Sequence, residues 1–127
     1  SIKHRLIAHD RTVWSAIFSS DGTRVVTASE DDTAVIWNTE TGKPIHVLEP
    51  HRGDVSHAFF SPDGSTVCTV EQKWDGNAVR MWSAETGKQV WQSESIEDRF
   101  MYAAFSRSGK YLAATNQNGH VYIWELK

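Results

Sequence analysis

The chain has 127 residues, of which 39% are hydrophobic and 23% charged, with a formal net charge of −3. This composition is typical of a water-soluble globular protein with one modest core. The negative charge argues against a nucleic-acid partner or an anionic membrane surface. No apolar run approaches the roughly 20 residues of a membrane span. The sequence opens without a charged-then-apolar leader, which favours a cytoplasmic location, and it begins with Ser1 rather than Met, which favours a piece of a longer chain.

The same local pattern occurs three times along the chain. Each copy opens with a short apolar strand that ends in Phe, and these strands are expected at 12–18, 54–60 and 99–105. A tight turn containing Gly follows each of them, because Gly adopts the positive φ of such turns without steric cost. A second strand rich in Val and Ala follows each turn, at 24–29, 65–70 and 110–115.

Each copy continues into a third strand that carries a tryptophan. These residues, Trp37, Trp82 and Trp124, are spaced 82 − 37 = 45 and 124 − 82 = 42 residues apart, which is the period of a repeat architecture. Fourth strands are expected at 44–48 and 89–93, and a strand of the same type at 4–7 near the start of the chain. No segment has helical periodicity. The sequence therefore predicts an all-β protein of twelve short strands in groups of four, with a longer loop at 71–76 in the second copy.

The first copy carries a family resemblance in its polar residues. His9, the SSDG turn at 19–22, Ser29, Asp31 and Trp37 resemble a WD40 repeat. The resemblance covers essentially the whole chain as three repeats, and it implies a β-propeller segment whose blades each have four antiparallel strands. Blade one is expected at about 9–49, blade two at about 51–93 and blade three at about 96–126. The strand at 4–7 would serve as an outer strand when a ring closes.

Ser, His and Asp within one repeat raise the question of a catalytic triad. The resemblance implies instead a structural hydrogen-bonded chain of His9, Ser29, Asp31 and Trp37, in which buried polar groups satisfy one another. The later copies keep only part of this set, namely His51, Trp82 and Trp124. Copy two has Gly76 at the Asp position with Asp75 displaced by one, and copy three has Ile96, Asn116 and Asn118 in place of His, Ser and Asp. A complete network is therefore expected only in blade one, and blades two and three are expected to rely more on apolar packing and to be softer.

Residues beside the inner strand of each blade are expected, by the same resemblance, to face one rim of the propeller. This set, called the rim below, is Thr12, Trp14, Glu30, Asp54, Ser56, Asp75, Arg99, Met101 and Gln117. Trp, Arg and Met are enriched where proteins bind one another. The rim is therefore a candidate site for a protein or peptide, and a Trp14 side chain fully buried between blades would argue against it.

The sequence shows no pattern typical of a metal or cofactor site. One cysteine, Cys68, cannot form an internal disulfide and aligns with small apolar residues of the other copies, which indicates a core position. The six histidines have no ligand spacing with cysteines, and the glycines lie singly at turns rather than in a phosphate loop. We expect no cofactor and no metal.

Three blades are fewer than the four to eight that close a propeller. The open faces and strand edges of such a segment favour association. Two or three copies could form a six- or nine-bladed ring, or the remaining blades of a longer propeller could complete it. The predicted function is a non-enzymatic scaffold for protein binding. The alternative is a small-ligand or hydrolytic site in the central channel, with Ser15, His57 and Tyr102 as candidates.

Overall fold

The computed structural model describes residues 1–72, 77–95 and 99–126. These residues form eleven strands and no helix, arranged as three antiparallel sheets. The first sheet is β1 (Val13–Phe18), β2 (Arg24–Ser29), β3 (Ala34–Asn38) and β4 (Pro44–Leu48). The second is β5 (Asp54–Phe60), β6 (Thr66–Gln72), β7 (Val79–Ser83) and β8 (Gln89–Gln92). The third is β9 (Phe100–Phe105), β10 (Tyr111–Asn116) and β11 (Val121–Glu125).

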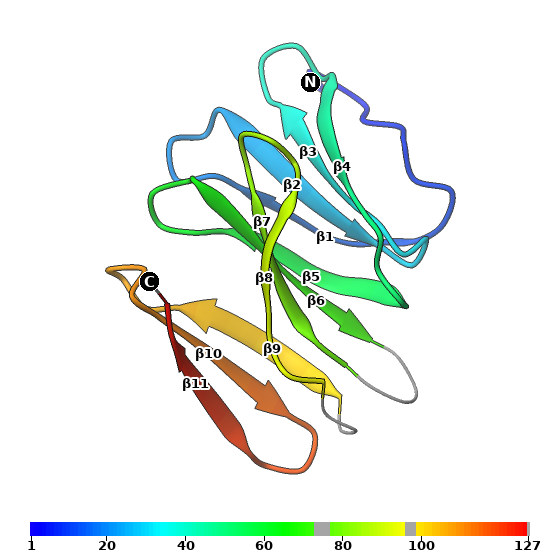
Figure 1. The fold of residues 1–127 in the computed structure, drawn as a ribbon. Helices are drawn as coiled ribbons and strands as arrows, with labels where there is room; N and C mark the ends of the chain where they lie inside the picture. Colours follow the sequence, from blue (N-terminus) through cyan, green and yellow to red (C-terminus); the bar gives the residue numbers. More distant parts are fainter. Residues whose placement is uncertain (73–76, 96–98, 127) are drawn as a thin grey trace.

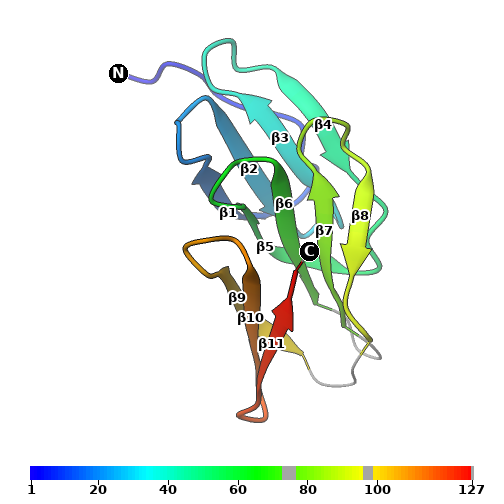
Figure 2. The same ribbon diagram turned by 60° about the vertical axis from the view of Figure 1, so that its left-hand side comes forward.

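Each sheet is a simple meander in which consecutive strands pair through short turns. The three sheets lie face to face in chain order, and each begins with its inner strand, β1, β5 or β9 (Figures 1 and 2). They do not close into a ring, so the first and third sheets each present an outer face. The predicted all-β fold built from propeller blades is confirmed.

Apolar side chains fill the two spaces between neighbouring sheets. Between the first and second sheets, Val26, Ile36 and Leu48 pack with Val55 and Trp82. Between the second and third sheets, the core is formed by Cys68, Val70, Val79, Met81, Phe100 and Leu112. Both faces of the second sheet are thus covered, which explains why its central strands β6 and β7 are buried along almost their whole length. Cys68 lies in this core with no exposed surface, and burial raises the pKa of its thiol.

The first residues do not form the strand predicted at 4–7. They nevertheless contact the first sheet as β4 contacts the second. His4 Nε2 donates to the Glu40 carbonyl at 2.8 Å, and His46 Nε2 donates to the Glu85 carbonyl at 2.7 Å. Segment 1–8 is thus placed like an outer strand, but the sheet that would pair with it is not present, so no strand hydrogen bonds form.

The turns beneath these two histidines require glycine. A Cβ at Gly42 would lie 2.7 Å from His4 Cγ, and one at Gly87 would lie 2.8 Å from His46 Cγ. Both glycines also have positive φ, 72° and 75°. The two Thr-Gly turns therefore allow the close approach of one blade's outer segment to the next blade.

The longer loop predicted at 71–76 is corrected at its start. Strand β6 continues through Glu71 and Gln72, which pair with Val55 and Asp54 of β5. Residues 73–76 lie outside the described residues. The third sheet has three described strands, and β11 pairs on one side with β10.

Candidate functional site

A β-bulge interrupts the inner strand of each sheet at the same position. The register shifts between Val13 and Ser15 in β1, between Val55 and His57 in β5, and between Asn116 and Thr115 opposite β9. The extra residues are Trp14, Ser56 and Met101, which are 42 and 45 residues apart. A bulge redirects a side chain out of the regular pleat. Trp14 and Met101 are 52% and 49% exposed, so neither is buried between blades.

Two further positions of the rim face each other across the first two strands of each sheet. Glu30 N donates to the Thr12 carbonyl, Gln72 pairs with Asp54, and Gln117 N donates to the Arg99 carbonyl. In the second sheet Gln72 therefore occupies the place expected for Asp75, which lies outside the described residues. Gln72 follows Glu30 by 42 residues, the offset that relates the first two inner strands, whereas the prediction of Asp75 follows the offset of 45 residues between Trp37 and Trp82.

Negative charge collects on the rim where the first two sheets meet. Partial burial raises the pKa of Asp54, and the carboxylates of Glu30 and Asp32 raise it further, against the opposing charge of Arg11. The carboxylates of Glu30 and Asp32 thus lie close enough to Asp54 to disfavour its ionisation. A partner that brings positive charge to this part of the rim would relieve the repulsion.

The polar network of blade one links a tryptophan to an aspartate. Trp37 Nε1 donates to Thr27 Oγ1 at 2.9 Å, and Thr27 Oγ1 lies 2.7 Å from His9 Nε2. His9 Nδ1 lies 2.9 Å from Asp31 Oδ2. The hydroxyl in this chain belongs to Thr27, and not to Ser29 as expected. Ser29 lies two residues further along β2, where its hydroxyl donates to the Thr12 carbonyl and accepts from Asp31 N.

The ionised state of Asp31 sets the proton positions along this network. Burial opposes ionisation, but hydrogen bonds from Thr33, His9 and the Asp10 backbone N–H outweigh it and lower the pKa of Asp31 to about 2. A carboxylate only accepts, so His9 Nδ1 donates to it. In a neutral His9 ring, Nε2 then accepts from Thr27, whose oxygen accepts from Trp37.

Blade two holds the same hydroxyl but a different charged pair. Thr69 Oγ1 accepts from Trp82 Nε1 and lies 2.9 Å from His51 Nε2. The carboxylate comes from Glu71, which accepts from Arg52 N at 2.8 Å, as Asp31 accepts from Asp10 N in blade one. Blade two therefore has an extensive polar network, contrary to the expectation that it would rely more on apolar packing.

Arg80 completes the blade-two network. Its Nη2 lies 2.8 Å from Glu71 Oε1, and its Nη1 donates to Gln89 and Gln92 of β8. Glu71 and Arg80 occupy the positions of Ser29 and Val35 in blade one, at offsets of 42 and 45 residues. The side chain of His51 is buried, and this burial together with the Arg80 charge lowers its pKa to about 4, against weaker support from the Asp32 and Leu48 carbonyls.

Blade three lacks the hydroxyl as well as the His and Asp. Ala114 stands at the position of Thr27 and Thr69, and Trp124 Nε1 donates to Glu94 at 3.4 Å. Asn116 Oδ1 accepts from Asn118 N and His120 N, which closes the β10–β11 turn. Ile96 lies outside the described residues. Aromatic contacts of Trp124 with Trp91, Phe100 and Tyr122 stabilise this blade instead.

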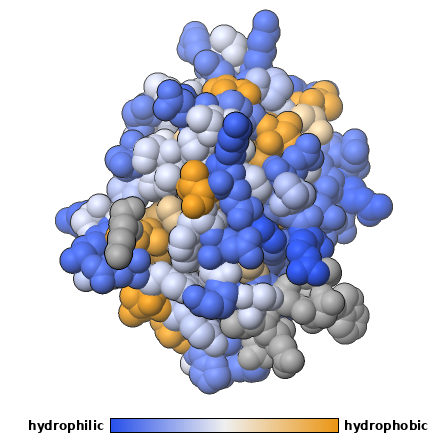
Figure 3. All heavy atoms as spheres, viewed as in Figure 1, coloured by the Kyte–Doolittle hydropathy of each residue, from blue (hydrophilic) through white to orange (hydrophobic). Residues whose placement is uncertain are grey.

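The two outer faces of the segment expose apolar residues whose counterparts in the second sheet are buried. On the first sheet, Phe18 is 61% exposed, whereas its counterpart Phe60 is 9% exposed. On the third sheet, Ile123 is 69% exposed, whereas its counterpart Met81 is 7% exposed. Apolar side chains gather over β11 at the lower left of Figure 3. Both faces therefore have the character of blade-to-blade interfaces that lack a partner.

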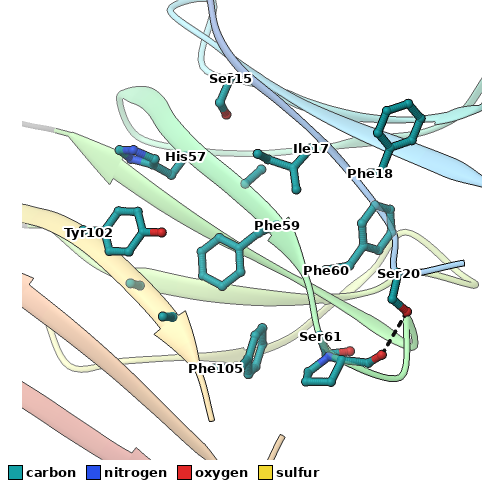
Figure 4. A pocket seen from close by; sticks show the side chains of 14 residues that line it. Ser15, Ile17, Phe18, Ser20, His57, Phe59, Phe60, Ser61, Tyr102 and Phe105 are labelled. Atoms are coloured by element: carbon teal, nitrogen blue, oxygen red, sulfur yellow. Dashed lines mark hydrogen bonds between the residues drawn. The ribbon is translucent and has the colours of Figure 1, made fainter. Parts of the chain in front are cut away.

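A cavity of about 390 Å³ lies along the three inner strands (Figure 4). Ser15, His57 and Tyr102, the candidates for a channel site, all line it. His57 Nδ1 lies 3.2 Å from Ser56 Oγ, and Ser15 Oγ is buried without a hydrogen-bond partner among the described residues. Ser15 and His57 thus share a cavity without forming the hydrogen-bonded pair of a nucleophile and its base.

The family model described as "WD domain, G-beta repeat" matches residues 1–38, 42–83 and 97–125. The chain belongs to the WD40-repeat family. Repeats of this family build β-propeller blades. The family is generally non-catalytic and provides scaffolds for protein interaction.

Known proteins of this family are similar over most of the chain. It is 34% identical over 120 residues to the WD repeat-containing protein 26 homolog of Drosophila melanogaster, covering 90% of this chain and 19% of that protein. It is 29% identical over 114 residues to transcription initiation factor TFIID subunit 5 of Caenorhabditis elegans, covering 90% of this chain and 17% of that protein. The chain therefore spans about a fifth of the length of these relatives.

A solved structure confirms the fold. The crystal structure of RRP9 WD40 repeats superposes with a TM-score of 0.85 at 21% identity, covering 95% of this chain and 37% of that one. Among the described residues there is no helix able to span a membrane. The same residues contain no group of three or more His, Cys, Asp or Glu side chains arranged to hold a metal ion.

Proposed function

We propose that this chain is a non-catalytic interaction scaffold, in which a WD40 segment joins further blades into a ring and binds a protein or peptide at its rim. The observation that carries the proposal is the bulge repeated at Trp14, Ser56 and Met101. The bulge recurs at the same position of each inner strand, and two of the three bulged side chains, Trp14 and Met101, are 52% and 49% exposed. Exposed Trp and Met side chains are suited to binding other proteins.

The chemistry of the rim favours a partner with a basic segment. Asp54, Glu30 and Asp32 lie close together beside the first two inner strands. A Lys or Arg side chain placed among them would gain charge-assisted hydrogen bonds. Trp14 in the first blade, which is 52% exposed, offers an aromatic face for a further cationic or apolar side chain of the same partner.

Selection from a random peptide library tests the rim. The immobilised chain should retain a set of peptides enriched in Lys or Arg, and the Trp14→Ala variant should lose most of them. A Ser108→Ala variant, changed on a turn of blade three, serves as the control and should retain the set. Peptides retained equally by the chain and by Trp14→Ala would contradict the rim proposal.

Ring completion is proposed from the exposed faces and from segment 1–8. The supplementary blades come from other copies, giving a dimeric or trimeric ring, or from the rest of a longer propeller. Light scattering over a dilution series measures the solution mass and so distinguishes these two sources of blades. A mass of two or three chains that persists on dilution, and falls to one chain in Ile123→Glu, supports copies as the source. A monomer supports a longer propeller.

The alternative function, a small-ligand or hydrolytic site in the channel, receives less support. The missing hydrogen bond between Ser15 and His57 argues against hydrolysis, because an activated serine requires an adjacent base. The cavity beside these residues still supports binding, which is developed below.

A further inference from the structure

The cavity on the inner strands has a polar layer near the rim and an apolar layer behind it. Ser15, His57 and Tyr102 each follow directly after the bulged residue of their strand, so they form a collar one residue away from the rim. Ile17 and Phe59 lie two residues further along β1 and β5, and side chains two apart on a strand share a face. Figure 4 shows this order from Ser15 and His57 past Phe59 toward Phe60 and Phe105.

The far end of the cavity is crossed by a contact between two blades. Ser20 Oγ donates to the Pro62 carbonyl at 3.2 Å, drawn as the dashed line in Figure 4. The apolar layer is aromatic and ordered, with the rings of Phe59 and Phe105 packed edge to face at 5.5 Å. Both layers reach solvent, because Tyr102 of the collar and Ile17 of the apolar layer are 58% and 45% exposed.

The collar also has unused hydrogen-bonding capacity. Ser15 Oγ is buried and has no partner in the described part of the chain, which is unfavourable unless a ligand or water supplies one. Burial lowers the pKa of His57, so its ring is held toward the neutral form. Among the residues that the structure describes, no Asp, Glu, Lys or Arg lines the cavity. A charged group placed inside would be desolvated without a counter-charge, so the cavity favours a neutral ligand.

We propose that this cavity receives one uncharged aromatic side chain of the partner peptide, of the size of phenylalanine, with the collar hydrogen-bonded to the peptide backbone. The proposal rests on the rim function and identifies a second feature of the same partner. A volume of about 390 Å³ accommodates a benzene-sized ring, for which about 150 Å³ is sufficient, together with the adjacent backbone amide. Because each collar residue directly follows a bulged residue of the rim, the cavity adjoins the proposed peptide site.

Nuclear magnetic resonance titration with blocked amino acids tests the cavity directly. The probes are the N-acetyl methylamides of phenylalanine, lysine and aspartate, added separately to the labelled chain. The phenylalanine probe should shift the resonances of His57 and Ala103, and should bind at least tenfold more tightly than the two charged probes. Equal shifts from all three probes, or no shift from the phenylalanine probe up to its solubility limit, would overturn the proposal.

Two serine variants test the collar. Ser15→Ala should lower the affinity for the phenylalanine probe about two- to tenfold, because the substitution removes one neutral hydrogen bond. Ser108→Ala should leave its affinity unchanged. The probe titration on the unmodified chain decides the proposal even if Ser15→Ala fails to fold. Binding of the phenylalanine probe without any peptide selected at the rim would retain the cavity site and reject the rim function.

Discussion

Glu71 and Arg80 form an ion pair of 2.8 Å with side chains only 1% and 10% exposed, at positions that hold a serine and a valine in the preceding blade. The pair fixes Arg52 N on one side and reaches Gln89 and Gln92 on the other. Two substitutions in different strands have thus produced a new charged centre beside an unchanged Trp–Thr–His arrangement. In both blades a carboxylate accepts a hydrogen bond from the backbone N–H of the residue that follows the His. This carboxylate belongs to Asp31 in blade one and to Glu71 in blade two.

Breaking one member of this pair should destabilise the protein more than replacing both. Arg80→Val leaves a buried, unpaired Glu71 carboxylate, and we expect a loss of about 3–5 kcal/mol in the free energy of unfolding. Glu71→Ser combined with Arg80→Val reproduces the residues of blade one and should recover part of that loss. Urea unfolding of the two variants measures the difference. A double variant less stable than Arg80→Val would show that the pair does not act as a unit.

The threonine hydroxyls at the centre of the two networks should contribute to stability. Thr27→Val and Thr69→Val each preserve the side-chain shape but remove the acceptor for a buried indole N–H, and we expect each to lower the free energy of unfolding by about 1–3 kcal/mol. Thr39→Val is the matched control, because Thr39 Oγ1 is buried without a partner among the described residues. This control should be neutral or stabilising. Chemical denaturation of all three variants provides the comparison, and equal losses would contradict the assigned roles.

Asp31 should matter far more than its neighbour Asp32. Asp31 accepts from Thr33, His9 and Asp10 N, so Asp31→Asn should destabilise the protein by about 1–3 kcal/mol. Asp32 is exposed at a positive φ of 69°, which asparagine tolerates, so Asp32→Asn should have little effect. Thermal unfolding of the two variants tests this. Similar changes in melting temperature would contradict a specific role for Asp31 in the network.

Protonation of His51 should weaken the folded state at mildly acidic pH. Its pKa is about 4 in the folded protein, against an ordinary value of 6.5. Between pH 6.5 and 4 the unfolded chain binds more protons than the folded chain at this site, so stability decreases as pH falls through this window. Above pH 6.5, His51 is neutral in both states, so its titration does not change the free energy of unfolding. The full shift corresponds to roughly 3 kcal/mol.

A difference measurement isolates this effect of His51 from other titrating groups. The free energy of unfolding is measured from pH 7 to pH 4 for the parent, for His51→Gln and for His120→Gln, which is changed at an exposed position. The curve of His51→Gln should be flatter than that of the parent, and the curve of His120→Gln should match the parent. Parallel curves for the parent and His51→Gln would rule out a neutral, buried His51 as the source of the pH dependence.

Repeat arithmetic in the sequence located much of the site, and its errors have a common origin. The offset of 42 residues correctly relates Trp14 to Ser56, and the same offset from Glu30 identifies Gln72. The prediction of Asp75 counts from Trp82 instead, at an offset of 45 residues, because the second copy has three additional residues between Phe60 and Trp82. Selecting the hydroxyl of the network by family position chose Ser29, whereas Thr27 makes the contacts, because it lies nearer to Trp37 across the paired strands β2 and β3.

The sequence by itself determined the fold, the number of blades and eleven of the twelve predicted strands, because strand alternation, turn glycines and the spacing of the tryptophans are local signals that recur. Only the tertiary structure decided which polar side chains meet. The Glu71–Arg80 pair, the exposure of Trp14 and the cavity beside Ser15 depend on neighbouring strands and blades. The residues that form them lie from 9 to 90 positions apart in the sequence. The tertiary structure also decided that segment 1–8 does not form a strand. An outer strand requires a sheet edge to pair with, and segment 1–8 cannot provide that edge itself.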